Sequence, residues 1–276
     1  MPELPEVETI VRGLQNVLDR TFFDVWTDSP KQLKKPASFL NFKKEIKGKK
    51  IKKIWRRGKN IIFDLSSGLS LLIHQKLTGR LLVGKWKEDR VNNFLRFIFW
   101  LDDGSMLALS DLRRFAKIEL WNTRSLLESK EINSLGPEPL DKKFTFVVFE
   151  KRLRKKRGRI KQVLMDQSVI AGIGNIYSDE ILFRAGVNPL KKIFDLEENE
   201  LREIYANVKP VLKKAIKLHG ESFSNFRDVN GEKGNFDKEI KVYQRQGEKC
   251  FVCGATIECL KIGGRTAHFC PRCQEL

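Results

Sequence analysis

The cysteines constrain this chain more than any other feature of its sequence. All five lie between positions 250 and 273, and four form two Cys-x2-Cys pairs, Cys250 with Cys253 and Cys270 with Cys273. Each pair can present two thiolates to one ion, and two such pairs complete a tetrahedron. The spacing therefore predicts a zinc ion held by these four residues. A pair of local redox motifs is the alternative interpretation.

The predicted zinc is structural, since four protein ligands leave no open position for a water molecule. A segment as short as 241–276 has little core, so we expect the metal to supply most of its folding free energy. Cys259 falls outside the pattern and is expected to be a packed free thiol. A disulfide-stapled secreted protein would spread its cysteines along the chain, so their clustering argues against that class.

The charge of the chain indicates a polyanionic partner. Lys and Arg number 53 against 35 Asp and Glu, a formal net charge of +18. This excess favours nucleic acid first and an anionic membrane surface second. No apolar run approaches the ~20 residues of a membrane helix, and the densest, 94–101, contains Arg96. The first residues lack the basic and apolar regions of a signal peptide, so we expect neither an integral membrane protein nor a secreted one.

The first half of the chain has the pattern of one helix followed by many short strands. Apolar residues recur at helical spacing over 5–18, and acidic residues precede them. Beyond residue 20, β-rich runs alternate with turn signals, as in a β-sandwich. We therefore predict an N-terminal β-sandwich domain with an N-terminal helix over 1–133. The clearest strands are expected at 61–65, 70–74, 94–101, 106–110 and 116–121.

The second half is expected to be helical, which makes the chain an α+β protein. Residues 134–140 have the composition of a linker, and 141–240 are predicted to form a helical domain that ends in a flexible loop at about 220–240. The zinc module occupies 241–276. Helices are expected at 144–153, 160–166, 176–184 and 197–218.

Three motifs in this half could meet a phosphate backbone. The stretch 142–161 holds ten Lys or Arg and one acid, so it is a phosphate-facing surface or a solvated helix face. The Gly-x-Gly-Asn turn at 172–175 could approach an anion or serve helix packing. Arg265 follows two glycines between the cysteine pairs, where it is a hairpin tip against DNA or an exposed turn arginine.

Pro2 and Glu3 form a candidate nucleophile and acid–base pair. Removal of Met1 would leave proline as the N-terminus, with an α-amino pKa of about 8 rather than the 10.4 or so of lysine. Such an amine can condense with a sugar C1′ to give an iminium ion, and Glu3 stands beside it to move protons. Proline after Met1 and acids at a helix start are also common without any chemistry.

Arg113 and Phe115 follow a predicted strand and could act on an opened base pair. A cation can hydrogen-bond an orphaned base while a ring inserts into the stack. Composition alone favours the alternative, in which Phe115 is a core residue.

These separate blocks together resemble one family. Residues 2–9, 135–140 and 165–180, and the four-cysteine module with Arg265, are similar to the corresponding segments of bacterial formamidopyrimidine-DNA glycosylases. The likeness covers the whole chain in order. It implies a β-sandwich domain, a helix–two-turn–helix domain and a β-hairpin zinc finger.

The resemblance also implies an activity. Members remove oxidised purines such as 8-oxoguanine and formamidopyrimidines from damaged double-stranded DNA and then cleave the strand by β,δ-elimination. By this match Pro2 is the nucleophile that forms the Schiff base, and Glu3 is the proton donor. Lys59 and Arg265 match the residues assigned to β- and δ-elimination. The family further implies a monomer with one structural Zn2+, in a bacterial cytoplasm, associated with the nucleoid through DNA.

Seven further residues match DNA-binding positions of the family. Arg113 and Phe115 match the void-filling and wedging pair, which reverses the expectation of a core Phe115. Glu6 lines the active site, and His74 lies near the DNA or is a buried strand histidine. Lys156 and Asn175 match positions that grip the backbone. Leu77 stands where a void-filling methionine is usual, so fine specificity is open.

Other departures are Ala116 and Gln244, each in place of a common glycine, and 91–93 in place of a histidine-containing stretch.

Two rival classes remain. One is the endonuclease VIII-like branch, which acts on oxidised pyrimidines. Leu4 and the 220–240 segment argue against this branch. The other is a catalytically inactive zinc-containing nucleic-acid-binding protein, which need not keep Pro2 and Glu3.

Overall fold

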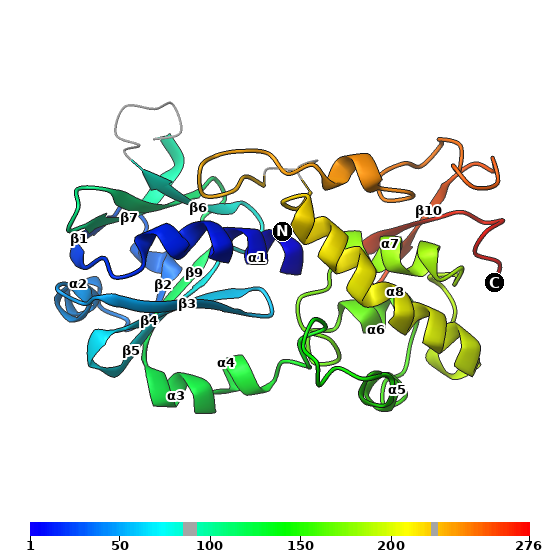
Figure 1. Cartoon of the computed structure of the whole chain (residues 1–276), viewed down its shortest axis with the longest axis horizontal. Coiled ribbons are helices and arrows are strands. Elements are labelled where there is room, and N and C mark those ends of the chain that lie inside the picture. The colour runs from blue at the N-terminus through cyan, green and yellow to red at the C-terminus, as the bar shows by residue number, and fades with distance from the viewer. Residues whose placement is uncertain (85–92, 222–225) are drawn as a thin grey trace. The chain divides into compact units, whose positions relative to one another are not determined.

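The computed structural model describes residues 1–84, 93–221 and 226–276 (Figure 1). The chain divides into two compact units. Unit 1 comprises Met1–Asn133 and Leu218–Asn235, and unit 2 comprises Ser134–Lys217 and Phe236–Leu276. Thus 218–235, which the sequence places in the helical domain, is part of unit 1. The reason is long-range packing, because Val229 lies in the core of unit 1 and its carbonyl accepts the N–H of Val83 at 2.9 Å.

Unit 1 begins with helix α1 (Leu4–Gly13), which continues as a short 3-10 turn over Leu14–Val17. Its start is fixed by a capping box in which Glu3 and Glu6 satisfy each other's backbone N–H groups. Apolar residues at helical spacing, including Val7, Ile10 and Val11, are buried in the core of the unit. The helix runs beside strand β3 (Ile51–Arg57) in Figure 1.

Two sheets form the rest of unit 1 and confirm the predicted β-sandwich. A four-stranded sheet has the order β1 (Phe22–Thr27), β7 (Leu95–Leu101), β8 (Met106–Asp111), β6 (Gly79–Gly84). A five-stranded sheet has the order β2 (Leu33–Lys35), β9 (Lys117–Asn122), β5 (Leu69–His74), β4 (Asn60–Leu65), β3. Neighbouring strands are antiparallel except β2 and β9.

The core of unit 1 draws apolar side chains from both sheets. Phe97 and Phe99 come from β7, Phe63 comes from β4, and Phe42 comes from helix α2 (Phe39–Ile46). All four are fully buried, and Phe42 contacts Phe97 and Phe99 edge to face. The first segment of unit 1 ends with the short helices α3 (Thr123–Glu128) and α4 (Lys130–Asn133).

Unit 2 is helical, as predicted, and ends in a hairpin. Its longer helices are α5 (Phe146–Leu153), α6 (Ile160–Met165), α7 (Asn175–Arg184) and α8 (Glu198–Lys217). Strands β10 (Glu258–Ile262) and β11 (Arg265–Phe269) pair antiparallel around a two-residue turn. Among the described residues, the helices include none that is both long and apolar enough to cross a membrane.

Candidate functional site

The start of helix α1 is buried together with the acids around it. Pro2 is buried, and Glu3 and Glu6 are each about 2 % exposed. Glu6 Oε2 accepts the backbone N–H of Glu3 at 2.8 Å, and Glu6 Oε1 accepts that of Glu221 at 3.0 Å. The Glu6 carboxylate therefore links Glu3, the residue beside the proposed nucleophile, to Glu221 near the start of the 218–235 segment.

Gly220 is required beside Glu6 for two reasons. Its φ of +81° is in the left-handed region that side chains rarely adopt, and a Cβ there would lie 2.8 Å from Glu6 Oε1. The base of the segment is closed by the N–H of Asn235, which donates to the carbonyl of Leu218 at 2.8 Å. The two ends of the 218–235 segment are thus joined to each other within unit 1, and the last residues of the predicted 220–240 loop belong to unit 2.

Lys59 lies in the two-residue turn between β3 and β4 and is largely buried. Arg56 connects this turn to α1, because its Nε donates to Glu8 at 3.1 Å and its Nη1 donates to the carbonyl of Gly58 at 3.0 Å. Helix α1 packs on β3, the strand that leads into this turn.

His74 ends strand β5 and is half-buried. Burial, together with the positive charges of Lys76, Lys59 and Lys117, lowers its pKa to about 3. Its Nδ1 accepts the N–H of Lys76 at 3.0 Å, so the neutral ring carries its proton on Nε2. This is a partly buried strand histidine, and its Nε2–H has no hydrogen-bond partner among the described residues.

Sequence reasoning missed two amides close in sequence to Lys59 and His74. Asn60 and Gln75 are each about 2–3 % exposed. Asn60 Oδ1 and both amide atoms of Gln75 have no hydrogen-bond partner in the described part of the chain. Buried polar atoms without partners are rare, and the sequence pattern around these two amides gives no signal for them.

Phe115 is 50 % exposed, which corrects the composition-based expectation of a core phenylalanine and agrees with the family match. The Arg113 guanidinium lies 4.6 Å from the centre of its ring. Leu77, on a different loop, is 37 % exposed. Ala116 is buried and has no left-handed backbone, so alanine fits where glycine is common.

The remaining departures differ in outcome. Gln244 has a φ of +56°, a conformation that favours glycine and is strained for glutamine. Of residues 91–93, Val91 and Asn92 lie outside the described residues, and Asn93 is exposed.

In unit 2, Asn175 is the first residue of α7, and its Oδ1 has no hydrogen-bond partner among the described residues. The turn before it is shaped by Gln167, whose amide accepts the N–H of Gly172 at 2.8 Å and donates to the carbonyl of Ile173 at 2.7 Å. The amide of Asn175 therefore stands at the positive end of a ten-residue helix.

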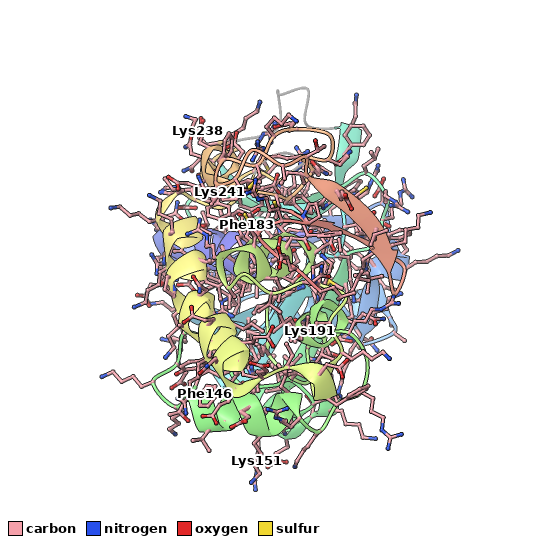
Figure 2. The ribbon with its side chains drawn as sticks, turned by 90° about the vertical axis from the view of Figure 1, so that its right-hand side faces the viewer. Phe146, Lys151, Phe183, Lys191, Lys238 and Lys241 are labelled. Atoms are coloured by element: carbon pink, nitrogen blue, oxygen red, sulfur yellow. The ribbon has the colours of Figure 1, made fainter. Side chains whose placement is uncertain are left out.

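The basic stretch 142–161 is mostly exposed, and Lys151 extends outward from α5 (Figure 2). Lys156 already has partners within the unit, since its Nζ forms an ion pair with Asp166 at 2.8 Å and donates to the Ser168 hydroxyl at 3.0 Å. Arg157 beside it is exposed. Lys161 is fully buried and pairs with Asp179 at 2.5 Å, so it belongs to the interior of the unit.

The zinc module is anchored to α7 by two successive acids. Asp179 accepts the backbone N–H of His268 on β11 at 3.0 Å. Glu180 accepts the N–H groups of three consecutive residues, Lys241, Val242 and Tyr243, at 2.9–3.1 Å. Burial raises the pKa of Glu180, while these N–H groups act in the opposite direction.

The four predicted ligands fit a tetrahedral zinc. Their sulfur atoms lie within 4.8 Å of one another, with 3.9 Å between Cys250 and Cys273 and 3.4 Å between Cys253 and Cys270. A Zn–S bond of about 2.3 Å implies sulfur separations of about 3.8 Å. Cys259 is exposed on β10, which corrects the expectation of a packed thiol: this strand belongs to a two-stranded hairpin.

Arg265 begins β11 at the tip of this hairpin and is exposed. Gly263 and Gly264 both have positive φ, as a two-residue hairpin turn of this kind requires. A Cβ on Gly263 would lie 2.2 Å from Nε2 of Gln162 on α6. The tip is thus placed against α6, and glycine is needed there.

Comparison with known proteins agrees with this architecture. Three family models match: Formamidopyrimidine-DNA glycosylase N-terminal domain over 1–118, Formamidopyrimidine-DNA glycosylase H2TH domain over 135–227, and zinc finger found in FPG and IleRS over 247–276. The formamidopyrimidine-DNA glycosylase of Pelotomaculum thermopropionicum is 39 % identical over 277 residues, covering both chains fully.

Solved structures match as well. The Lactococcus lactis Fpg in complex with abasic-site DNA has a TM-score of 0.91 at 34 % identity, covering 99 % of this chain and 100 % of that one. MutM in complex with DNA containing carbocyclic 8-oxo-G has a TM-score of 0.92 at 34 % identity, with full coverage of both chains. The fold and site define a zinc-finger DNA glycosylase of base excision repair. Within that class, the chain belongs to the formamidopyrimidine-DNA glycosylase family, as its sequence predicts.

Proposed function

We propose that this protein removes oxidised purines, 8-oxoguanine and formamidopyrimidines, from damaged double-stranded DNA and then cleaves the strand at the resulting site. The observation that carries the proposal is the buried Pro2–Glu3 start of α1, held by Glu6. Pro2 can act as the nucleophile only if Met1 is removed. With Met1 in place, the Pro2 nitrogen is an amide, and an amide nitrogen is not a nucleophile.

The chemistry follows from that amine. The nitrogen lone pair of Pro2 attacks C1′, the glycosidic bond breaks, and its electron pair leaves with the purine, which takes up a proton. The nitrogen then loses its proton, the C1′–O4′ bond opens, and Glu3 supplies the proton that O4′ takes. The product is the iminium ion of a Schiff base.

Strand cleavage uses the same intermediate twice. Loss of a C2′ proton expels the 3′ phosphate, and loss of a C4′ proton expels the 5′ phosphate. By the family match, Lys59 serves the first step and Arg265 the second. The near-complete burial of Lys59 and the hairpin-tip location of Arg265 support these roles.

We propose that Leu77, Arg113 and Phe115 fill the space left by the flipped nucleoside, because all three are exposed at loops of unit 1. Asn175 and Lys156 are proposed to hold the backbone, with His74 donating from Nε2 and Glu6 lining the base pocket. The excess of 18 positive charges supplies a grip that is independent of sequence and weakens with salt.

Bound zinc would crosslink the two cysteine pairs and stabilise the hairpin that carries Arg265. We further propose that the protein acts as a monomer in a bacterial cytoplasm, where free thiols remain available to the metal.

Borohydride trapping tests this function. Protein with Met1 removed should give a covalent adduct on duplex DNA that contains 8-oxoguanine opposite cytosine, and Pro2→Gly should weaken it. The same protein on a duplex with an oxidised pyrimidine should react more slowly. Absence of any adduct would contradict the mechanism, and faster reaction with the pyrimidine would favour the endonuclease VIII-like alternative.

A further inference from the structure

The exposed residues Leu77, Arg113 and Phe115 lie on two loops that neighbouring strands bring together. The loop 74–79 connects β5 to β6, and the loop 111–116 connects β8 to β9. Strands β6 and β8 pair with Gly79 opposite Asp111. The end of the first loop and the start of the second therefore lie side by side at one end of the four-stranded sheet, although about thirty residues separate them in the chain.

The carboxylate of Asp111 is fully buried and holds both loops. One oxygen accepts the hydroxyl of Thr78, from the other loop. The second oxygen accepts the N–H of Ala116 and the side chain of Gln32, both at 2.8 Å. The bond to Ala116 closes the 111–116 loop on itself, and the bond to Thr78 joins it to the 74–79 loop.

The Thr78 hydroxyl also accepts a hydrogen bond. While it donates to Asp111, its oxygen accepts the backbone N–H of Arg113 at 3.1 Å. Thr78 is the residue directly after Leu77. A single hydroxyl thus links the segment that carries Leu77 to the backbone that carries Arg113.

Each loop also contains one non-glycine residue with left-handed backbone, Lys76 (φ 55°) and Arg114 (φ 56°). Such conformations persist only where the surroundings over-determine them. His74 Nδ1 accepts the N–H of Lys76, and Arg114 pairs with Asp28 at 3.2 Å. The loops are therefore held in shape before any ligand arrives.

We propose that Thr78 and Asp111 are positioning residues for base extrusion. They lock Leu77, Arg113 and Phe115 into one insertion element, so the space of the flipped nucleoside is filled without ordering two loops separately. Neither residue contacts the reacting atoms; both act through the exposed three. The inference rests on the proposed function. Because the loops are already ordered in the free protein, less conformational entropy is lost when DNA binds.

The test compares Thr78→Val, which keeps the shape and loses the hydroxyl, with Thr78→Ser, which keeps the hydroxyl. Single-turnover excision of 8-oxoguanine from duplex DNA should fall about tenfold in Thr78→Val and stay within about twofold of the parent in Thr78→Ser. Borohydride trapping on an abasic site in single-stranded DNA, which has no base stack to open, should be equal in all three proteins. Base extrusion followed by 2-aminopurine fluorescence should slow only in Thr78→Val.

The possible results distinguish a failure of this inference from a failure of the proposed function. Equal duplex excision rates in Thr78→Val and the parent would overturn the positioning role. Equal losses of Thr78→Val on both substrates would assign Thr78 to folding and overturn it as well. Failure of the parent to excise 8-oxoguanine from the duplex would instead contradict the proposed function. Asp111→Asn supplies a second variant, which should repeat the Thr78→Val pattern.

Discussion

Glu6 holds Glu3 in place: one oxygen of the buried Glu6 carboxylate accepts the backbone N–H of Glu3 at 2.8 Å. Its other oxygen accepts the N–H of Glu221. The residue beside the proposed nucleophile is therefore fixed by a side chain that also fixes the 218–235 segment.

Glu6→Gln should lower both stability and activity. The amide keeps one acceptor and turns an N–H group toward a backbone donor, so one buried N–H loses its partner. We expect a loss of about 1–3 kcal/mol in the free energy of unfolding and a reduced excision rate. Urea unfolding and single-turnover excision measure the two effects. Glu45→Gln, at an exposed position of α2, is the control and should change neither.

Zinc removal should act on the hairpin and spare the sandwich. Cys253→Ser, or a strong chelator, should release one zinc per chain and weaken DNA binding at least tenfold, because the metal supplies most of the module's folding free energy. Zinc release is followed with a chromogenic chelator, and affinity by anisotropy. Cys259→Ser is the matched control, since this cysteine is exposed outside the cluster. Unchanged binding after zinc loss would contradict a structural role.

The depressed pKa of His74 predicts a loss of stability in acid. Its folded pKa of about 3 lies below the ordinary value of 6.5, so the unfolded chain binds more protons between these values. Stability contributed by neutral His74 is complete above about pH 6.5 and decreases by up to about 1.4 kcal/mol per pH unit below it. His74→Asn should flatten urea-unfolding free energies measured between pH 7 and pH 5.

The control for His74 is His219→Asn, at an exposed histidine with left-handed backbone that asparagine tolerates. The acid slope of this variant should match the parent's. An unchanged slope in His74→Asn would show that other groups govern the acid sensitivity.

Lys161→Met should destabilise unit 2 strongly. The substitution leaves the Asp179 carboxylate buried without its cation, and breaking a buried pair in this way costs about 3–5 kcal/mol. Since Asp179 also binds His268, DNA affinity should fall with stability. The double variant Lys161→Met with Asp179→Asn, which removes the buried charge and keeps an acceptor for the N–H of His268, should recover part of the loss in urea unfolding. A double variant less stable than the single one would contradict this account.

Much of the fold was predictable because it depends on local pattern. Short β-rich runs bounded by turn signals indicated strands such as β4 and β5, and helical spacing indicated α1 and α7. The zinc ligands were predictable for the same reason, because each Cys-x2-Cys pair is a local turn. Strands β1, β3 and β6 were not among the predicted strands. The strand β2 was missed as well, since three residues carry too little periodicity.

The sequence by itself determined the zinc ligands, the longer helices α1, α5, α6, α7 and α8, the strands β4, β5, β7, β8 and β9, and the family to which the chain belongs. Tertiary structure alone decided which residues from distant segments meet. Gln32, Thr78 and Asp111 converge because the sheet order β1-β7-β8-β6 differs from the chain order. Phe115 is exposed and 218–235 belongs to unit 1 for a related reason: local periodicity specifies an element and its buried face, whereas the neighbour of that face depends on long-range packing of the whole unit.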